Sequence, residues 1–326
     1  EVKPGEPYLY TNLFGEKIVN FPTKDHWKSL SRIEYIVKGL DLFLKKYKEW
    51  GIESIAFPPL GCGNGGLNWT EVGPIMFQKL ASLDIDVEIF APYGTPKEQL
   101  KKEFLQSHEV PGKKAALPMT TLKPGWVAIL EILHRLEQMQ YTQYVGRTLF
   151  QKICYVATRA GLQTGFQFSQ NSYGPFSHHV TEMEKILSNA NFIQESQLGS
   201  MIRICTGSEY PVLRNRFREH IMAQNSEIDR IVDLFSRIKN TRQAEEVTTV
   251  LYAVEDLTSG NVNKLTTEQD FFDYIVDWKK HWDTPEKKQS LANTIRNLVL
   301  MGWISIDYSR SLPVSDNEFA EAFESN

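Results

Sequence analysis

The sequence predicts an α/β domain followed by a mainly helical domain that carries small β-hairpins. Three observations lead to this fold class. Strand-like and helix-like runs alternate through residues 1–106, which is typical of an α/β layer fold with a mixed sheet. Residues 107–125 contain three prolines and two glycines without periodicity, as in a linker. Residues 126–312 then carry long amphipathic helical runs, and residues 313–326 form an acidic tail.

Composition narrows the classes of protein to which the chain can belong. It has 326 residues, of which 41% are hydrophobic and 23% charged, enough for two packed domains. No run approaches the length and apolarity of a membrane span, and the N-terminus resembles no signal peptide, so we expect a cytoplasmic protein that binds no membrane. The formal net charge of -4 gives no reason to expect general binding of polyanions.

The predicted elements of the first part follow from periodicity and turn signals. Two β-runs around a glycine turn indicate a hairpin, and an apolar run between prolines and charges indicates a strand covered on both faces. Apolar residues at intervals of three and four predict the helices. In chain order we expect strands at 8–14 and 17–23, a helix at 31–50, a strand at 53–60, a helix from about 68, and a strand at 85–92.

The second part combines helices with two places where a helix passes through a small-residue break into a β-run. Helical periodicity covers residues 126–139, 148–160, 217–238 and 244–257. The breaks lie in "EKILSNANFIQES" and "IRNLVLMGWISID", and the first continues through "QLGS" into "MIRICTG" as a hairpin. This pattern predicts a winged-helix-like architecture. Because the segments lack a dense lysine and arginine face, we favour contact with protein over DNA reading.

A glycine-rich loop is the first candidate site. Gly61, Gly63 and Gly66 in "GCGNGG" satisfy G-x-G-x-x-G between a predicted strand and helix. Glycines let backbone N–H groups approach a pyrophosphate, and the following helix N-terminus favours an anion. A nicotinamide-dependent oxidoreductase would need a longer parallel sheet than the chain offers. A tight turn that requires positive φ is the structural alternative.

The second candidate site is the segment "NFPTKDHW" after the first hairpin. Lys24 there is either an exposed charge or a reactive amine. His26 and Trp27 could flank a flipped nucleotide, since aromatic rings stack on bases, although such a tryptophan can equally dock a helix in the core. Cys62, Cys154 and Cys205 show no ligand spacing, so we expect free thiols and no metal site.

These motifs together resemble a known family. "NFPTK" followed by "PPLGCGNGGLNW" is similar to macrodomains of the DarG branch, bacterial antitoxins that remove ADP-ribose from thymidine in DNA modified by the toxin DarT. "LFQKICYVATRAG" and "YGPFSHHV" resemble the SocA-like antitoxin domain at the C-terminus of DarG proteins. The resemblance identifies 1–106 as a partial macrodomain. From the resemblance we expect the macrodomain to be N-terminally truncated, because residues 1–20 match none of the family's preceding elements.

The resemblance implies a set of roles. Lys24 would be catalytic, attacking the ribose anomeric carbon or forming a Schiff base, and no cofactor is expected. The ligands would be ADP-ribose and ADP-ribosylated single-stranded DNA, and the protein partner a DarT-like DNA ADP-ribosyltransferase toxin bound by residues 126–312. Thr23, His26 and Trp27 would contact the base or ribose, with Asn64 orienting a phosphate or hydroxyl. The loop residues implied in ADP-ribose binding are Gly61, Cys62, Gly63, Asn64, Gly65, Gly66 and Leu67.

A different class of function stays open beside this one. A non-catalytic antitoxin would act only by sequestering the toxin, and its neutralising effect would not depend on Lys24. The apparent truncation favours that alternative, whereas the match at the lysine and the loop favours a glycohydrolase.

Overall fold

The computed structural model describes residues 2–27, 29–106, 122–140, 142–199, 201–259 and 267–313. They divide into two compact units. The α/β unit lies within residues 1–122 and 181–218, and the helical unit lies within residues 123–180 and 219–326. The linker expected at 107–125 falls outside the described residues up to position 121, as does the acidic tail from position 314.

Two pairs of strands form the β-structure of the first 106 residues. β1 (Tyr8–Thr11) and β2 (Lys17–Asn20) pair antiparallel as the predicted hairpin. β3 (Ser54–Phe57) pairs parallel with β4 (Asp86–Ile89). The expected single mixed sheet is wrong for the described residues, because the two pairs are separate two-stranded sheets. β3 is also not covered on both faces, since Ser54 and Ala56 are exposed.

The helices of this segment supply its core. α1 (Ile33–Lys46) buries one stripe, and α2 (Trp69–Leu80) packs against it. Asn68 caps α2, because its side chain accepts a hydrogen bond from the Thr70 N–H at 3.2 Å. Beyond β4, a 3-10 turn η1 (Lys97–Leu100) leads into the short helix α3 (Lys102–Gln106), which packs against α2. The core between these elements includes Ile36, Leu40, Phe43, Phe57, Val72, Ile75 and Met76.

Phe21 fixes the chain that leaves β2. A Cβ added to Gly39 of α1 would lie 2.4 Å from the Phe21 ring, so only glycine lets the ring and the helix meet. Phe21 also packs edge-on against Phe57 of β3, with ring centroids 6.4 Å apart. The segment that carries Lys24 is therefore anchored to both α1 and β3.

A second hairpin belongs to the same unit. β5 (Ile193–Leu198) and β6 (Met201–Thr206) pair antiparallel between α6 (His178–Asn189) and α7 (Tyr210–Arg216), which confirms the hairpin predicted there. The Glu195 carboxylate accepts a hydrogen bond from the Leu30 N–H at 3.0 Å, and Arg32 donates to Asn191 Oδ1 at 3.0 Å. These bonds hold the start of α1 against the hairpin.

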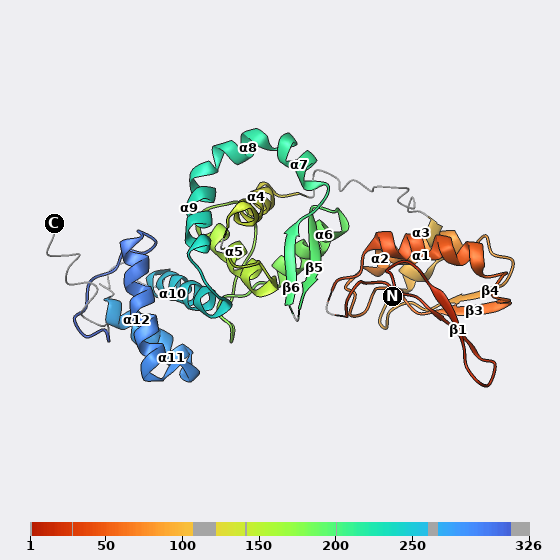
Figure 1. The fold of residues 1–326 in the computed structure, drawn as a ribbon, viewed down its shortest axis with the longest axis horizontal. Helices are drawn as coiled ribbons and strands as arrows, with labels where there is room; N and C mark the ends of the chain where they lie inside the picture. The colour runs from red at the N-terminus through yellow and green to blue at the C-terminus, as the bar shows by residue number, and fades with distance from the viewer. Residues whose placement is uncertain are drawn as a thin grey trace. The chain divides into compact units, whose positions relative to one another are not determined.

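Helices make up the helical unit. α9 (Asn225–Ser236) packs against α4 (Pro124–Gln138) and α5 (Arg147–Arg159), and α10 (Thr241–Ser259) packs against α5, α11 (Glu268–Trp278) and α12 (Pro285–Leu300) (Figure 1). The continuous run expected at 217–238 is wrong: α8 (Arg218–Ala223) ends before Gln224, and α9 begins after it, at Asn225. The β-run expected after α12 is also wrong, since the described residues there form a single bridge between Asp307 and Thr267.

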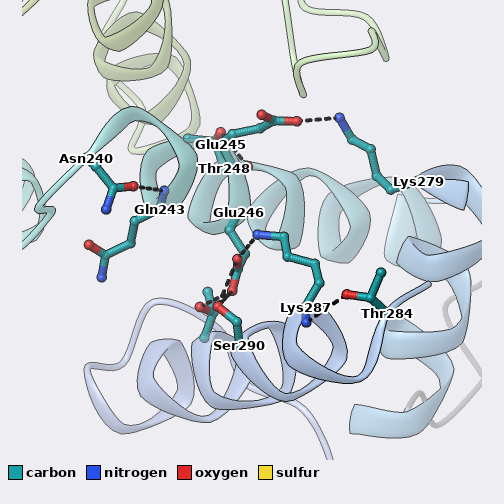
Figure 2. Close-up of polar contacts among 10 residues, drawn as sticks. Asn240, Gln243, Glu245, Glu246, Thr248, Lys279, Thr284, Lys287 and Ser290 are labelled. Carbon is teal, nitrogen blue, oxygen red and sulfur yellow. Dashed lines mark hydrogen bonds and ion pairs between the residues drawn. The ribbon is translucent and has the colours of Figure 1, made fainter. Parts of the chain in front are cut away.

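A buried carboxylate joins α10 to α12. Glu246 receives hydrogen bonds from Lys287, from Ser290 Oγ at 2.9 Å and from Thr294 Oγ1 at 2.7 Å (Figure 2). A buried charge with this many donors is satisfied, whereas one that lost them would be strongly destabilising. Within the described part of the chain, no helix is long and apolar enough to cross a membrane.

Candidate functional site

The structure brings Lys24 to the glycine-rich loop. Lys24 is half-buried and follows β2 and the anchored Phe21 in the chain. Its Nζ donates a hydrogen bond to the Trp27 carbonyl at 2.8 Å. The same Nζ lies 3.4 Å from the Asn64 carbonyl, in the middle of the loop. Two motifs 40 residues apart in sequence thus form one site.

Backbone hydrogen bonds shape the loop between β3 and α2. The N–H groups of Cys62, Gly66 and Leu67 donate to carbonyls within the loop or just before it, at 2.9 to 3.1 Å. Gly61 and Gly66 have φ of 73° and 74°, which glycine adopts without strain. Among the residues that the structure describes, no acceptor receives the N–H groups of Gly63, Asn64 or Gly65. Successive N–H groups of this kind can bind an anion, and the first turn of α2 adds its favourable dipole.

Ser31 connects the two motifs and was not recognised in the sequence. Its side chain is 1% exposed, its Oγ donates to Thr23 Oγ1 at 3.1 Å, and its N–H donates to the Gly65 carbonyl at 2.9 Å. A Cβ on Gly65 would lie 2.1 Å from Ser31 Oγ. Gly65 is therefore required for this contact. The sequence signal for Ser31 is weak, because a serine before a helix usually indicates a cap.

The aromatic residues beside Lys24 are placed differently from core residues. Trp27 is 72% exposed, which argues against the alternative that it docks a helix. The His26 and Trp27 rings lie 5.6 Å apart at an interplanar angle of 42°. An indole face next to the amine is a surface on which a base can stack.

Cys62 has no nucleophilic role in this arrangement. Burial, with a smaller contribution from the Glu71 carboxylate, raises the pKa of the Cys62 thiol to about 11, so the neutral thiol predominates near neutral pH. Its Sγ lies 3.6 Å from the Leu60 carbonyl, as expected of a thiol donor. The remaining predicted loop residues lie in the loop itself, with Gly63 and Asn64 exposed and Leu67 buried. No group of histidine, cysteine and acidic residues in the described ranges could hold a metal ion.

Comparison with known proteins finds a sequence match over the segment that carries both motifs. A macro domain family model matches residues 10–76. The DNA ADP-ribosyl transferase-DNA ADP-ribosyl glycohydrolase fusion protein of Thermosipho africanus is 42% identical over 125 residues, covering 32% of this chain and 32% of that protein. The DNA ADP-ribosyl glycohydrolase of Thermus aquaticus is 32% identical over 170 residues, covering 51% of this chain and 42% of that protein. The chain thus spans less than half the length of these relatives.

One solved structure adds a sequence match. Thermosipho africanus DarTG in complex with ADP-ribose is 41% identical over a region that covers 32% of this chain and 31% of that chain. Its TM-score is 0.30, so the overlay itself gives no information about the fold.

Proposed function

Because the chain carries a macro domain segment and is homologous to the DarG DNA ADP-ribosyl glycohydrolases, we propose that it removes ADP-ribose from thymidine in single-stranded DNA as an antitoxin. The macrodomain segment at 1–106 would carry the chemistry, and residues 126–312 would bind a DNA ADP-ribosyltransferase toxin. This activity would take place in the cytoplasm. The observation that carries the proposal is the contact between Lys24 and the glycine-rich loop.

The proposed reaction uses the amine as a nucleophile. After losing a proton to water, Lys24 Nζ attacks the anomeric carbon of the ribose, and the bond from that carbon to the base nitrogen breaks. The departing base nitrogen takes up a proton from water. A water molecule then displaces the lysine from the same carbon, which releases ADP-ribose and regenerates the amine.

The loop would hold the rest of the ligand. The N–H groups of Gly63, Asn64 and Gly65 would bind a pyrophosphate. Each of them lacks another acceptor among the described residues. Trp27 would stack on the base, with Thr23 and His26 beside it. Replacing Trp27 with alanine should lower affinity for modified DNA on the order of tenfold with little change in stability, since its ring is 72% exposed.

Release of ADP-ribose from single-stranded DNA bearing ADP-ribosyl-thymidine tests the proposal. We expect wild-type chain to release it, and Lys24→Ala and Lys24→Arg to lose at least about a hundredfold in rate, because arginine keeps the charge but is not a nucleophile. The control Lys45→Ala removes an exposed lysine of α1 and should leave the rate unchanged. If Lys24→Ala keeps wild-type activity, the lysine mechanism is wrong.

The toxin-binding role rests on separate support. In the Thermosipho africanus relative, a DNA ADP-ribosyl transferase and a glycohydrolase share one chain. Here Leu198 and Met201, at the tip of the β5–β6 hairpin, are each 45% exposed, which suits a protein contact by this predicted wing. Binding to a purified DNA ADP-ribosyltransferase should survive Lys24→Ala and weaken in the double variant Leu198→Asp, Met201→Asp. If the chain neutralises the toxin but releases no ADP-ribose from DNA, the purely sequestering alternative is favoured.

A further inference from the structure

The helical unit contains a pocket that the proposed chemistry does not use. Its volume is about 550 Å³, within the range of small-molecule sites. Loop residues 170–172 line one side, and the end of α11 with the following 3-10 turn η3 (Lys280–Trp282) lines the other. The lining residues are Gln170, Asn171, Ser172, Trp278, Lys279 and His281.

The loop side of the pocket is held from beneath by a buried lysine. Ser169 and Phe176 pair as an antiparallel bridge, which closes residues 170–175 into a tight loop. The Lys152 side chain, from α5, donates to the Tyr173 carbonyl at 2.5 Å and to the Pro175 carbonyl at 3.1 Å. Lys152 is only 2% exposed, so these contacts are shielded from water. They fix the backbone on which the pocket's loop side chains stand.

A second buried lysine fixes the opposite wall. Lys279 Nζ donates to the Ser172 carbonyl. It also donates to Glu245 Oε1 at 2.8 Å (Figure 2). The same ammonium lies 5.1 Å from the centroid of the Trp278 ring and 5.2 Å from that of Trp282. The loop and the end of α11 are therefore tied together before any ligand arrives.

The charges around the pocket are already matched. Lys279 pairs with Glu245, Lys280 with Asp277, Lys287 with Glu246, and Lys288 with Asp283. An acidic peptide or a free anion would need an ammonium group without such a partner. The pocket offers instead the exposed side-chain amides of Gln170 and Asn171, the exposed His281, and the partly exposed indole of Trp278.

We propose that this pocket binds a nucleobase of unmodified single-stranded DNA, stacked on Trp278 and hydrogen-bonded by the amides of Gln170 and Asn171. A side-chain amide presents a donor and an acceptor side by side, which matches the edge of a base. An indole stacks on any base. Because the nearby ammonium groups are paired, phosphate contacts contribute little, and affinity depends on salt less steeply than in a groove of free lysines.

Anisotropy of a labelled, unmodified oligothymidylate tests this inference independently of the glycohydrolase proposal. All proteins carry Trp27→Ala, so that the exposed indole of the other site contributes nothing. Relative to this parent, Trp278→Ala should weaken binding about tenfold or more, Trp278→Phe less than about threefold, and Asn171→Ala about threefold. His179→Ala, an exposed histidine that does not line the pocket, is the control for His281→Ala and should change nothing.

Two results would overturn the inference. One is that Asn171→Ala, His281→Ala and Trp278→Ala each bind the oligothymidylate as tightly as the parent. The other is displacement of the oligonucleotide by polyglutamate at equal charge, which would make the pocket an acidic-peptide site. Circular dichroism of each variant shows that it is folded, and the exposed Asn171 and His281 keep the test valid if Trp278→Ala does not fold.

Discussion

Lys24 and Lys279 show how their surroundings separate a lysine that is proposed to react from one that is structural. Lys24 is half-buried and contacts two backbone carbonyls, with no carboxylate among its contacts in the described residues. Lys279 is 1% exposed and bonds both a carboxylate and a carbonyl between two indole rings. The first can meet a ligand, whereas the second is fully occupied in holding two segments together.

The same difference holds for the loops beside each lysine. The glycine-rich loop keeps the N–H groups of Gly63, Asn64 and Gly65 without an acceptor in the described residues, and no side chain fills the space beside Gly63. In the loop at 170–175, the carbonyls of Ser172, Tyr173 and Pro175 accept hydrogen bonds from two ammonium groups. A loop prepared for an anion exposes donors, and a loop used as a wall has its backbone groups paired.

Replacing Lys279 and Lys24 in turn is the strongest test of this distinction. Lys279→Met leaves Glu245, whose side chain is 15% exposed, without its partner, and should lower the free energy of unfolding by about 3–5 kcal/mol. Lys24→Met should lower it by about 1 kcal/mol or less. Urea unfolding measures both, and adding Glu245→Gln to Lys279→Met should recover part of the loss. Equal losses for the two lysines would contradict the distinction.

Lys152, the other buried lysine beneath the loop at 170–175, should make the stability of the protein depend on pH. Burial lowers the pKa of Lys152 to about 8, whereas an unfolded lysine has a pKa of about 10.4. Between these values the unfolded chain binds more protons, so the free energy of unfolding should rise with pH, by on the order of 3 kcal/mol in total. Below about pH 8 the full cost of burying the charge is present. The difference in stability between wild type and Lys152→Met should carry this slope, and parallel curves would refute it.

Two glycines of one loop should lose different amounts of stability when each is replaced by alanine. Gly65→Ala places a Cβ 2.1 Å from Ser31 Oγ and 2.5 Å from the Gly61 carbonyl, which should cost about 1–3 kcal/mol of stability and weaken ADP-ribose binding. Gly63→Ala meets nothing within 4 Å and should cost less than about 1 kcal/mol. Thermal unfolding and calorimetric titration with ADP-ribose give both quantities. A larger loss at Gly63 than at Gly65 would contradict the close contact between Gly65 and Ser31.

Ser31→Ala should give a small effect. It removes the hydrogen bond to Thr23 Oγ1 but keeps the backbone bond to Gly65, so a loss of about 1 kcal/mol is expected, with affinity for ADP-ribose reduced a few-fold. The exposed Ser54→Ala on β3 is the matched control and should be neutral. If both variants behave alike, Ser31 does not position Thr23.

Local sequence patterns predicted the elements better than their assembly. Periodicity located α1, α5 and the β1–β2 hairpin to within a few residues, because each is set by neighbours in sequence. It did not reveal that β1–β2 and β3–β4 form separate sheets, since strand pairing depends on distant contacts. The interruption near Gln224 was also missed, because the apolar stripe continues across it.

The candidate sites were likewise predicted in part and missed in part. Motif resemblance predicted that Lys24 and the glycine-rich loop act together, and their contact is consistent with roles that stay predictions. Ser31 was missed because a single serine carries no pattern. The pocket in the helical unit was missed because residues 170–172 and 278–281 are about a hundred positions apart and share no motif.

The buried ammonium groups under residues 170–175 have a consequence for binding kinetics. A loop in which Lys152 and Lys279 hold three carbonyls loses conformational entropy during folding and not on binding. A ligand that meets it needs no further ordering step, so its arrival is limited by diffusion and orientation, and differences between ligands lie in how quickly they leave.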